Sequence, residues 1–219
     1  WTESEREYGK ALQFDPTVSY IHLTRGVSYL APLGKREEAV AELKKAVELE
    51  PLSLINNAIF GLSYLFAGQY DNALNQGEKT YDLDPNFRFG RQYLGSAYIL
   101  LGRYNDAIAL AERGLKTSPL SQEDLVIVGI AYAKSGRKLE AEQYLDRFRE
   151  LAKTQYVRTG YTASIYAALG DKDKAFAELE RSFEDKDCFL PRIKLDPFMD
   201  PLRDDPRFKD LLKRMGLPE

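Results

Sequence analysis

Apolar residues recur every three or four positions along most of the chain and predict short helices that pair. The stretch 88–121 shows this plan most clearly: an amphipathic helix, a turn at Gly102, a second helix, and a stop at Pro119. Glycine supplies the positive φ that such a turn requires, and proline cannot continue a helix. No β-hairpin pattern interrupts the arrangement, so the sequence predicts an all-α protein.

The plan repeats with a fixed period of 34 residues. The turn glycines are Gly34, Gly68, Gly102, Gly136 and Gly170. The small residues that open the second helices keep the same step, at Ala39, Ala73, Ala107, Ala141 and Ala175. Two columns in phase indicate stacked units that grow in one dimension and share no single globular core.

The period divides the chain into seven parts. We expect the second helix of a truncated repeat in 1–18, five units at about 19–53, 54–87, 88–121, 122–155 and 156–187, and a C-terminal cap in 188–219. Three Asp-Pro pairs in the cap suit helix N-termini. After the last pair, apolar residues from Phe208 to Met215 lie at helical spacing and predict a capping helix over the final repeat, which solenoids require.

Three irregularities carry predictions of their own. One extra residue lies between Tyr29 and Gly34, so we expect an early helix end or a bulge at Pro32. Gly77 and Thr80 occupy positions where larger apolar groups are usual, which predicts thinner packing there. Lys153 stands where the period predicts a proline, so the second helix of the fourth unit is expected to run to about that residue.

The order Gly-x-Ala-Tyr, Gly-Arg-Tyr-x-x-Ala and a closing proline resembles the tetratricopeptide repeat (TPR) over about 2–187. The resemblance implies a right-handed α-solenoid of antiparallel helix pairs, a TPR superhelix, ending in a C-terminal capping helix. The sequence from 190 to 218 resembles the ending of large bacterial signalling proteins, in which a winged-helix DNA-binding domain, a protein kinase or a nucleotide cyclase precedes a TPR array. Because the chain begins at Trp1 inside a repeat, we expect a longer parent protein.

In TPR arrays the first helices of successive repeats line a concave groove, and the resemblance places the candidate binding residues there. They are Tyr20, Leu23, Ile59, Leu62, Phe66, Phe89, Gln92, Tyr93, Ser96, Ile127, Ile130 and Tyr161. Family members that clamp a C-terminal carboxylate use Lys, Arg and Asn at such positions, whereas these are mostly apolar. The expected occupant is an amphipathic helix or an extended apolar segment of a partner, or the chain's own termini. A groove narrowed by its own side chains is the structural alternative.

Two further sets of side chains have both a structural and a binding interpretation. The tyrosines four residues before the turn glycines, from Tyr64 to Tyr166, are expected to pack between helices rather than to contact a ligand. Arg88, Arg91 and Arg103 lie in one repeat and could hold an acidic group, although solvation at the surface is the favoured interpretation.

Composition and charge argue against nucleic-acid binding, membrane insertion, catalysis and metal binding by this chain. Its 31 basic and 34 acidic residues are interspersed and leave a net charge of −3, which is no footprint for nucleic acid. No apolar run reaches the ~20 residues that insertion into a membrane needs. His22 is the only histidine and Cys188 the only cysteine, so neither a catalytic triad nor a zinc site is expected, and Cys188 is interpreted as a half-buried apolar group. We predict no enzyme activity and no cofactor or metal.

The leading functional prediction is a scaffold or regulatory module that binds a protein or peptide in its concave groove. A sensor for a small ligand or signal peptide is the alternative from another class. A structural spacer that forms a homo-oligomer is a third. A cytoplasmic location is expected, although an extracytoplasmic one is compatible with a parent protein whose N-terminal part lies outside this chain.

Overall fold

The computed structural model describes residues 1–187 and 190–217, and within these ranges the regular structure is entirely helical. The α-helices are α1 (Thr2–Phe14), α2 (Ser19–Thr24), α3 (Arg36–Leu49), α4 (Leu54–Phe66), α5 (Tyr70–Leu83), α6 (Arg88–Leu100), α7 (Tyr104–Thr117), α8 (Gln122–Lys134), α9 (Lys138–Leu151), α10 (Thr159–Leu169), α11 (Lys172–Glu184) and α12 (Pro206–Arg214). A π-helix, η1 (Arg25–Leu30), follows α2, and two 3₁₀ helices, η2 (Leu190–Arg192) and η3 (Pro197–Leu202), precede α12.

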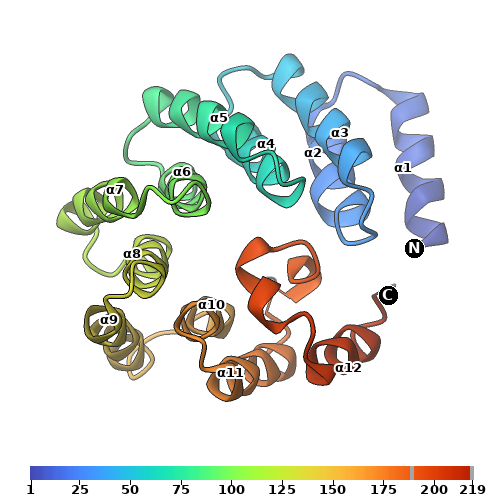
Figure 1. The fold of residues 1–219 in the computed structure, drawn as a ribbon. Helices are drawn as coiled ribbons and strands as arrows, with labels where there is room; N and C mark the ends of the chain where they lie inside the picture. Colours follow the sequence, from blue (N-terminus) through green and yellow to red (C-terminus); the bar gives the residue numbers. More distant parts are fainter. Residues whose placement is uncertain (188–189, 218–219) are drawn as a thin grey trace.

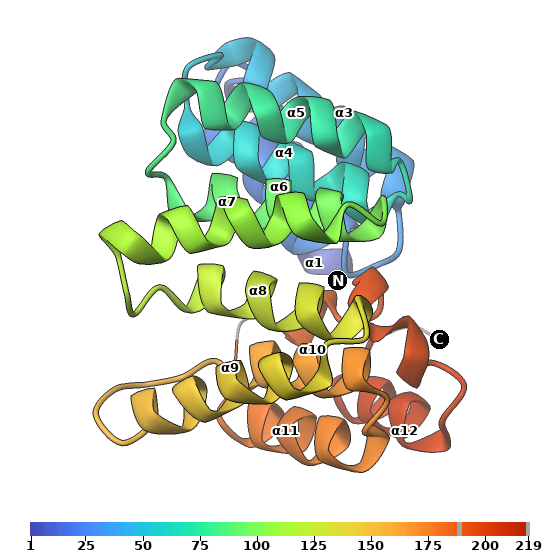
Figure 2. The same ribbon diagram turned by 60° about the vertical axis from the view of Figure 1, so that its left-hand side comes forward.

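The helices form antiparallel pairs that follow one another around a curve, with α4, α6, α8 and α10 on the inner side (Figure 1). The outer row is α5, α7, α9 and α11, and the view turned by 60° shows the pairs stacked along the curve (Figure 2). Each inner helix packs on its own partner and on the inner helices of the neighbouring pairs. The predicted all-α, helical-repeat superhelix is confirmed.

The turn glycines adopt the conformation that their spacing predicts. All five have φ between 72° and 81°. At the third, the Gly102 N–H donates to the Ile99 carbonyl at 3.0 Å and the Arg103 N–H donates to the Tyr98 carbonyl at 2.8 Å. This pair of bonds is a Schellman motif, which satisfies the last carbonyls of the inner helix and reverses the chain.

The tyrosine column packs between helices, as predicted. Tyr132 and Tyr166 are each 8% exposed. Where an arginine follows the turn glycine, it covers the ring: the guanidinium carbons of Arg103 and Arg137 lie 4.4 Å and 4.3 Å from the ring centroids of Tyr98 and Tyr132. Such a stack buries the ring and keeps the charge in water.

The irregularity in the first full unit is a π-helical bulge, η1, that ends at Leu30, four residues before Gly34, whereas α4, α6 and α8 end two residues before their turn glycines. The Ala31 N–H donates to the Gly26 carbonyl, five residues back, which is the π-type bond. The Lys35 N–H then donates to the Leu30 carbonyl, as the residue after the turn glycine does in the later repeats. A π-turn accommodates one more residue than an α-turn, so the extra residue is absorbed before Pro32 and Gly34 still closes the turn.

Two other sequence-based expectations need correction. The helices do not separate at Gly77; a Cβ built there would lie 3.1 Å from the Leu94 Cα, so the missing side chain brings α5 and α6 closer together. Thr80 is fully buried beside them. Helix α9 does not extend to Lys153 but ends at Leu151 with the same 14 residues as α7, and the extra length lies in the connection to α10.

The chain ends in a helix laid on the last repeat. Helix α12 packs on α11 through Phe208 and Leu211, which share a buried cluster with Phe176 and Leu179. Two ion pairs tie the helices together: Arg207 Nη1 to Asp173 Oδ1 at 2.9 Å, and Arg214 Nη2 to Glu180 Oε2 at 2.7 Å.

Two of the three Asp-Pro pairs begin helices in the predicted way. Asp196 accepts the Phe198 N–H at 2.9 Å and Asp205 accepts the Arg207 N–H at 3.0 Å. Asp200 instead lies inside η3, because the 3₁₀ helix continues through Pro201. The interpretation of Cys188 concerns a residue outside the described ranges.

The segment before α12 turns inward and lies within the curve of inner helices (Figure 1). Leu195 is 4% exposed and belongs to the same buried cluster as Leu30 and Leu62, near the start of the array. Met199 and Leu202 are fully buried against the last repeats, where η3 contacts α10. Residues 190–202, called the inner segment below, therefore bridge the two ends of the superhelix across its concave face.

Candidate functional site: a cavity on the concave face

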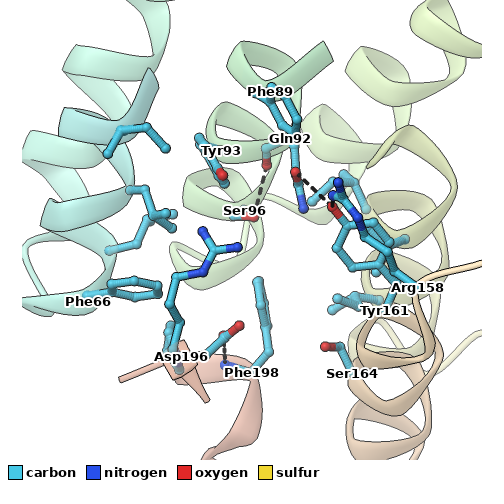
Figure 3. Close-up of a pocket in the computed structure, with 18 of the residues that line it drawn as sticks. Phe66, Phe89, Gln92, Tyr93, Ser96, Arg158, Tyr161, Ser164, Asp196 and Phe198 are labelled. Atoms are coloured by element: carbon cyan, nitrogen blue, oxygen red, sulfur yellow. Dashed lines mark hydrogen bonds between the residues drawn. The ribbon is translucent and has the colours of Figure 1, made fainter. Parts of the chain in front are cut away.

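A cavity of about 220 Å³ lies between the inner helices and the inner segment (Figure 3). Its walls are mostly apolar, and it is partly open to solvent. The lining residues are Ile55, Ile59, Leu62, Leu65 and Phe66 from α4, Phe89, Gln92, Tyr93 and Ser96 from α6, Val126, Ile127 and Ile130 from α8, Arg158, Tyr161 and Ser164 at α10, and Arg192, Asp196, Pro197 and Phe198 from the inner segment.

Ten of the twelve predicted groove residues line this cavity, from Ile59 to Tyr161. The other two lie elsewhere. Tyr20 is 68% exposed on α2, and Leu23 is buried in a cluster with Leu43 and Phe60. Helix α2 gives way to the π-helix after Thr24, so the first unit does not present its inner face in the register of the later ones.

The inner segment contributes cavity residues that the repeat pattern does not predict. Phe198 and Asp196 point into the cavity from below the inner helices, opposite Tyr93 and Ser96 (Figure 3). The sequence allowed the chain's own termini to enter the groove, but Asp-Pro pairs and scattered apolar residues do not specify where such a segment docks. The groove is thus partly occupied by the chain itself, which leaves a cavity in place of a long open channel.

Polar groups gather at one end of the cavity, where α6 faces α10. Arg158 Nη1 donates to the Tyr161 hydroxyl at 2.8 Å, and this hydroxyl donates to Gln92 Oε1 at 3.4 Å (Figure 3). Burial raises the pKa of Tyr161 well above its ordinary value, so the phenol stays protonated at any physiological pH. Arg158 also lies 3.6 Å from Glu123, a buried carboxylate that Arg88 approaches at 3.5 Å.

Asp196 supplies a titratable group on the opposite side. Its carboxylate caps η3, and burial raises its pKa to about 6 despite the nearby Arg192 and Arg203 guanidinium groups. The cavity is therefore bounded by two arginines and one carboxylate that is mostly ionised at pH 7 and is half protonated at about pH 6.

A second hollow, of about 710 Å³, continues from the cavity over the loops between repeats. Phe89 and Arg158 line both hollows. The outer hollow is more polar, and it carries Arg88, Gln122 and the exposed Leu120 and Tyr156 on its sides.

The three arginines of the third repeat do not form one acid-binding cluster. Each has its own carboxylate: Arg88 approaches Glu123, Arg91 forms a buried pair with Asp124, and Arg103 donates to Asp106 at 2.7 Å on the outer surface. Helical spacing directs the three side chains to different neighbours.

The histidine considered for catalysis and metal binding has a structural role. His22 is buried, with Nδ1 at 2.6 Å from Glu42 Oε2 and Nε2 at 2.9 Å from the Pro16 carbonyl oxygen, so it joins α2 to α3 and to the preceding loop. Among the residues that the structure covers, no three His, Cys, Asp or Glu side chains gather as a metal site requires. In the same ranges, no helix is long and apolar enough to cross a bilayer.

Comparison with known proteins identifies the repeat. Residues 20–51 match the model of the tetratricopeptide repeat family. A TPR protein of Thermus thermophilus is 21% identical with a TM-score of 0.63, over 84% of this chain and 99% of that one. The Cut9–Hcn1 hetero-tetramer of the APC/C is 17% identical with a TM-score of 0.65, over 97% of this chain and 45% of that one. MamA is 25% identical with a TM-score of 0.54, over 69% and 85%. No curated protein sequence matches the chain significantly.

The fold is therefore a helical-repeat superhelix of the tetratricopeptide type. Proteins built from such repeats generally act as scaffolds that mediate protein–protein interactions.

Proposed function

We propose that this chain is a protein-interaction module that holds a partner segment on its concave face. The observation that carries the proposal is the cavity itself, an apolar hollow that is bounded by four successive inner helices and partly open to solvent, with the partly exposed Ile55 and Phe89 in its lining. Apolar surface of this kind gains most when a partner's side chain displaces water from it.

The size of the cavity favours an extended partner segment over a helix. One turn of an α-helix with its side chains, about 10 Å across and 5.4 Å high, occupies roughly 400 Å³. The cavity holds about 220 Å³. A single large apolar side chain fits this space, and the extended backbone on either side of it would follow the outer hollow past Arg158 and Arg88.

The context that we propose is a larger bacterial signalling protein. The support is the resemblance of residues 190–218 to the ending of such proteins and the presence of a repeat scaffold before it. In this role the module would bring a target to an effector domain elsewhere in the parent chain.

Capture from a lysate of the source organism tests the proposal. The altered protein carries Ile55→Glu and Phe89→Glu, both partly exposed at the rim of the cavity. The matched control carries Leu139→Glu, which is 75% exposed on the outer helix α9. A protein retained by the parent and by the control but lost by the rim variant supports the proposal, and an identical set retained by all three contradicts it.

A further inference from the structure

The cavity has room for one aromatic side chain. An engineered cavity of about 150 Å³ lined by aliphatic and aromatic side chains binds benzene, which has six non-hydrogen atoms. In proportion, a cavity of about 220 Å³ holds a group of about nine such atoms. The side chains of phenylalanine, tyrosine and tryptophan are all of this order of size, so the wall of the cavity decides among them.

Aromatic rings form much of that wall. The rings of Phe89 and Tyr93 on α6 lie stacked, with their centroids 6.4 Å apart and 17° between their planes. Phe66 on α4 and Phe198 on the inner segment face the same space (Figure 3). Contacts between rings add to the burial of apolar surface, so this wall favours an aromatic occupant over an aliphatic one.

Tyr93 brings a hydroxyl group into the cavity that has no protein partner in the described part of the chain. The residue is 9% exposed, and its hydroxyl points into the cavity (Figure 3). Within residues 1–187 and 190–217 this hydroxyl makes no hydrogen bond, and its oxygen is not sealed from solvent. It is therefore available both to donate to a ligand and to accept from one.

Gln92, on the same helix, supplies unused N–H donors. Arg158 Nη1 donates to the Tyr161 hydroxyl, so the hydrogen of that hydroxyl is directed at Gln92 Oε1, 3.4 Å away. This contact assigns the oxygen of the Gln92 amide to the side of Tyr161. The amide nitrogen makes no hydrogen bond to any residue that the structure describes, which leaves two N–H groups in need of an acceptor.

The charged groups at the cavity have partners, so they do not select a charged occupant. Arg158 lies 3.6 Å from Glu123. Arg192 and Arg203 lie near enough to Asp196 to favour its ionised form. A charged side chain that entered the cavity would lose its water and meet charges that are already paired.

The unused groups therefore call for a neutral group that both accepts and donates hydrogen bonds. A phenol hydroxyl does both, an indole N–H only donates, and a phenyl ring does neither. A phenyl or indole ring in the cavity would leave the Gln92 N–H groups buried without an acceptor, which weakens binding.

We infer that the cavity selects a phenol, and that the partner residue that enters it is a tyrosine. Its ring packs among the aromatic side chains of the wall, and its hydroxyl lies at α6, where Gln92 and Tyr93 offer unused hydrogen-bonding groups. The assignment to a partner residue rests on the proposed function, whereas the selection of a phenol does not.

Isothermal titration of the whole chain with p-cresol, toluene and 3-methylindole, which stand for the side chains of tyrosine, phenylalanine and tryptophan, tests the inference. We expect p-cresol to bind saturably with one site per chain. Toluene and 3-methylindole are expected to bind at least about tenfold more weakly, because neither accepts a hydrogen bond from Gln92.

Variants of the two polar residues test the cause of this preference. Tyr93→Phe and Gln92→Leu are each expected to weaken p-cresol binding about fivefold and to leave toluene binding unchanged or tighter. Tyr132→Phe is the matched control, because it removes a tyrosine hydroxyl that lies outside the cavity lining and bonds to Glu112. This control should bind all three compounds as the parent does.

The location is tested by filling the cavity. Ile59→Trp should abolish p-cresol binding; if this variant loses its helical circular dichroism, Ile55→Trp at the 40% exposed rim serves instead. Absence of saturable p-cresol binding, equal or tighter binding of toluene or 3-methylindole, or p-cresol binding that survives the tryptophan would each overturn the inference. No partner takes part in these titrations, so their failure is distinct from a failure of partner capture.

Discussion

Arg91 and Asp124 form a bidentate ion pair that joins the inner helices of two successive repeats. Arg91 Nε donates to Asp124 Oδ1 at 2.9 Å and Nη2 donates to Oδ2 at 2.7 Å, and the side chains are 3% and 1% exposed. The remaining Nη1 donates to the Pro85 carbonyl at 3.0 Å. Gly114 makes room for the pair, since a Cβ there would overlap Arg91 Nε and Asp124 Oδ2.

Breaking this pair from one side should destabilise the protein strongly. Asp124→Ala leaves a buried guanidinium without its carboxylate, and the expected loss of unfolding free energy is about 3–5 kcal/mol. Urea denaturation followed by circular dichroism measures it. The double variant Arg91→Met/Asp124→Leu should lose less than Asp124→Ala, because it removes both charges.

The control for this prediction is Asp106→Ala, which breaks the solvent-exposed pair with Arg103 and should cost far less stability, because water screens that pair. Equal costs for Asp124→Ala and Asp106→Ala would show that the buried pair does not hold the repeats together.

Gly129 permits close contact between α8 and α10. A Cβ at this position would lie 2.6 Å from the Ile165 Cδ1 atom and 3.0 Å from its Cγ1. We expect Gly129→Ala to destabilise the protein by about 1–3 kcal/mol through overpacking, and Ile165→Val to recover part of that loss by removing Cδ1. Thermal unfolding of the two single variants and the double variant measures the coupling.

Gly61 provides the matched comparison, because it lies two repeat periods before Gly129 in the same position of its repeat. Its added Cβ would meet nothing nearer than 3.7 Å. Gly61→Ala should therefore raise stability by up to about 1 kcal/mol through helix propensity alone. A Gly129→Ala variant that is also stabilised would disprove the close-contact role.

The half-buried Asp196 side chain should make stability depend on pH. Its folded-state pKa of about 6 lies above the ordinary aspartate value of about 3.9, so the folded state binds the proton more tightly. Stability is then highest below about pH 4 and falls as pH rises from about 4 to about 6, as far as this group is concerned.

Asp196→Asn removes that cost and keeps an oxygen that accepts the Phe198 N–H. We expect it to be more stable than the parent by about 1–3 kcal/mol at pH 7, with no difference at pH 4. Urea denaturation at pH 4 and pH 7 measures the unfolding free energy of the parent and the variant. A variant that is less stable than the parent at pH 7 would mean that the ionised carboxylate contributes stability through its arginine neighbours.

Removal of the C-terminal region should expose the inside of the superhelix. Deletion of 196–219 removes Met199, Leu202 and Leu211, which are fully buried, and uncovers apolar surface on α10 and α11. We expect lower solubility, binding of the dye ANS and a lower melting temperature. Deletion of 1–15 is the control, because α1 contains no buried residue and should change the melting temperature far less. Equal behaviour of the two deletions would refute a packing role for the C-terminal region.

The sequence alone determined the repeat. Turn glycines and helix stops act through hydrogen bonds that span a few residues, so their spacing predicted the pairs of helices. The resemblance to the TPR then placed ten of the cavity residues in the groove. The same local rule predicted an early helix end or a bulge at Pro32, but it did not place the π-turn within 25–30, because either arrangement satisfies the spacing.

Only the tertiary structure decided what closes the concave face and which charges lie inside it. The pairing of Arg91 with Asp124 and the position of Asp196 opposite Tyr93 depend on contacts between segments that are distant in sequence. A charged residue at a helical position fits either solvent or a buried partner, and the packing of neighbouring repeats determines which. The inner segment likewise gains its place from apolar burial against both ends of the superhelix, a free energy that exists only once the curve has formed.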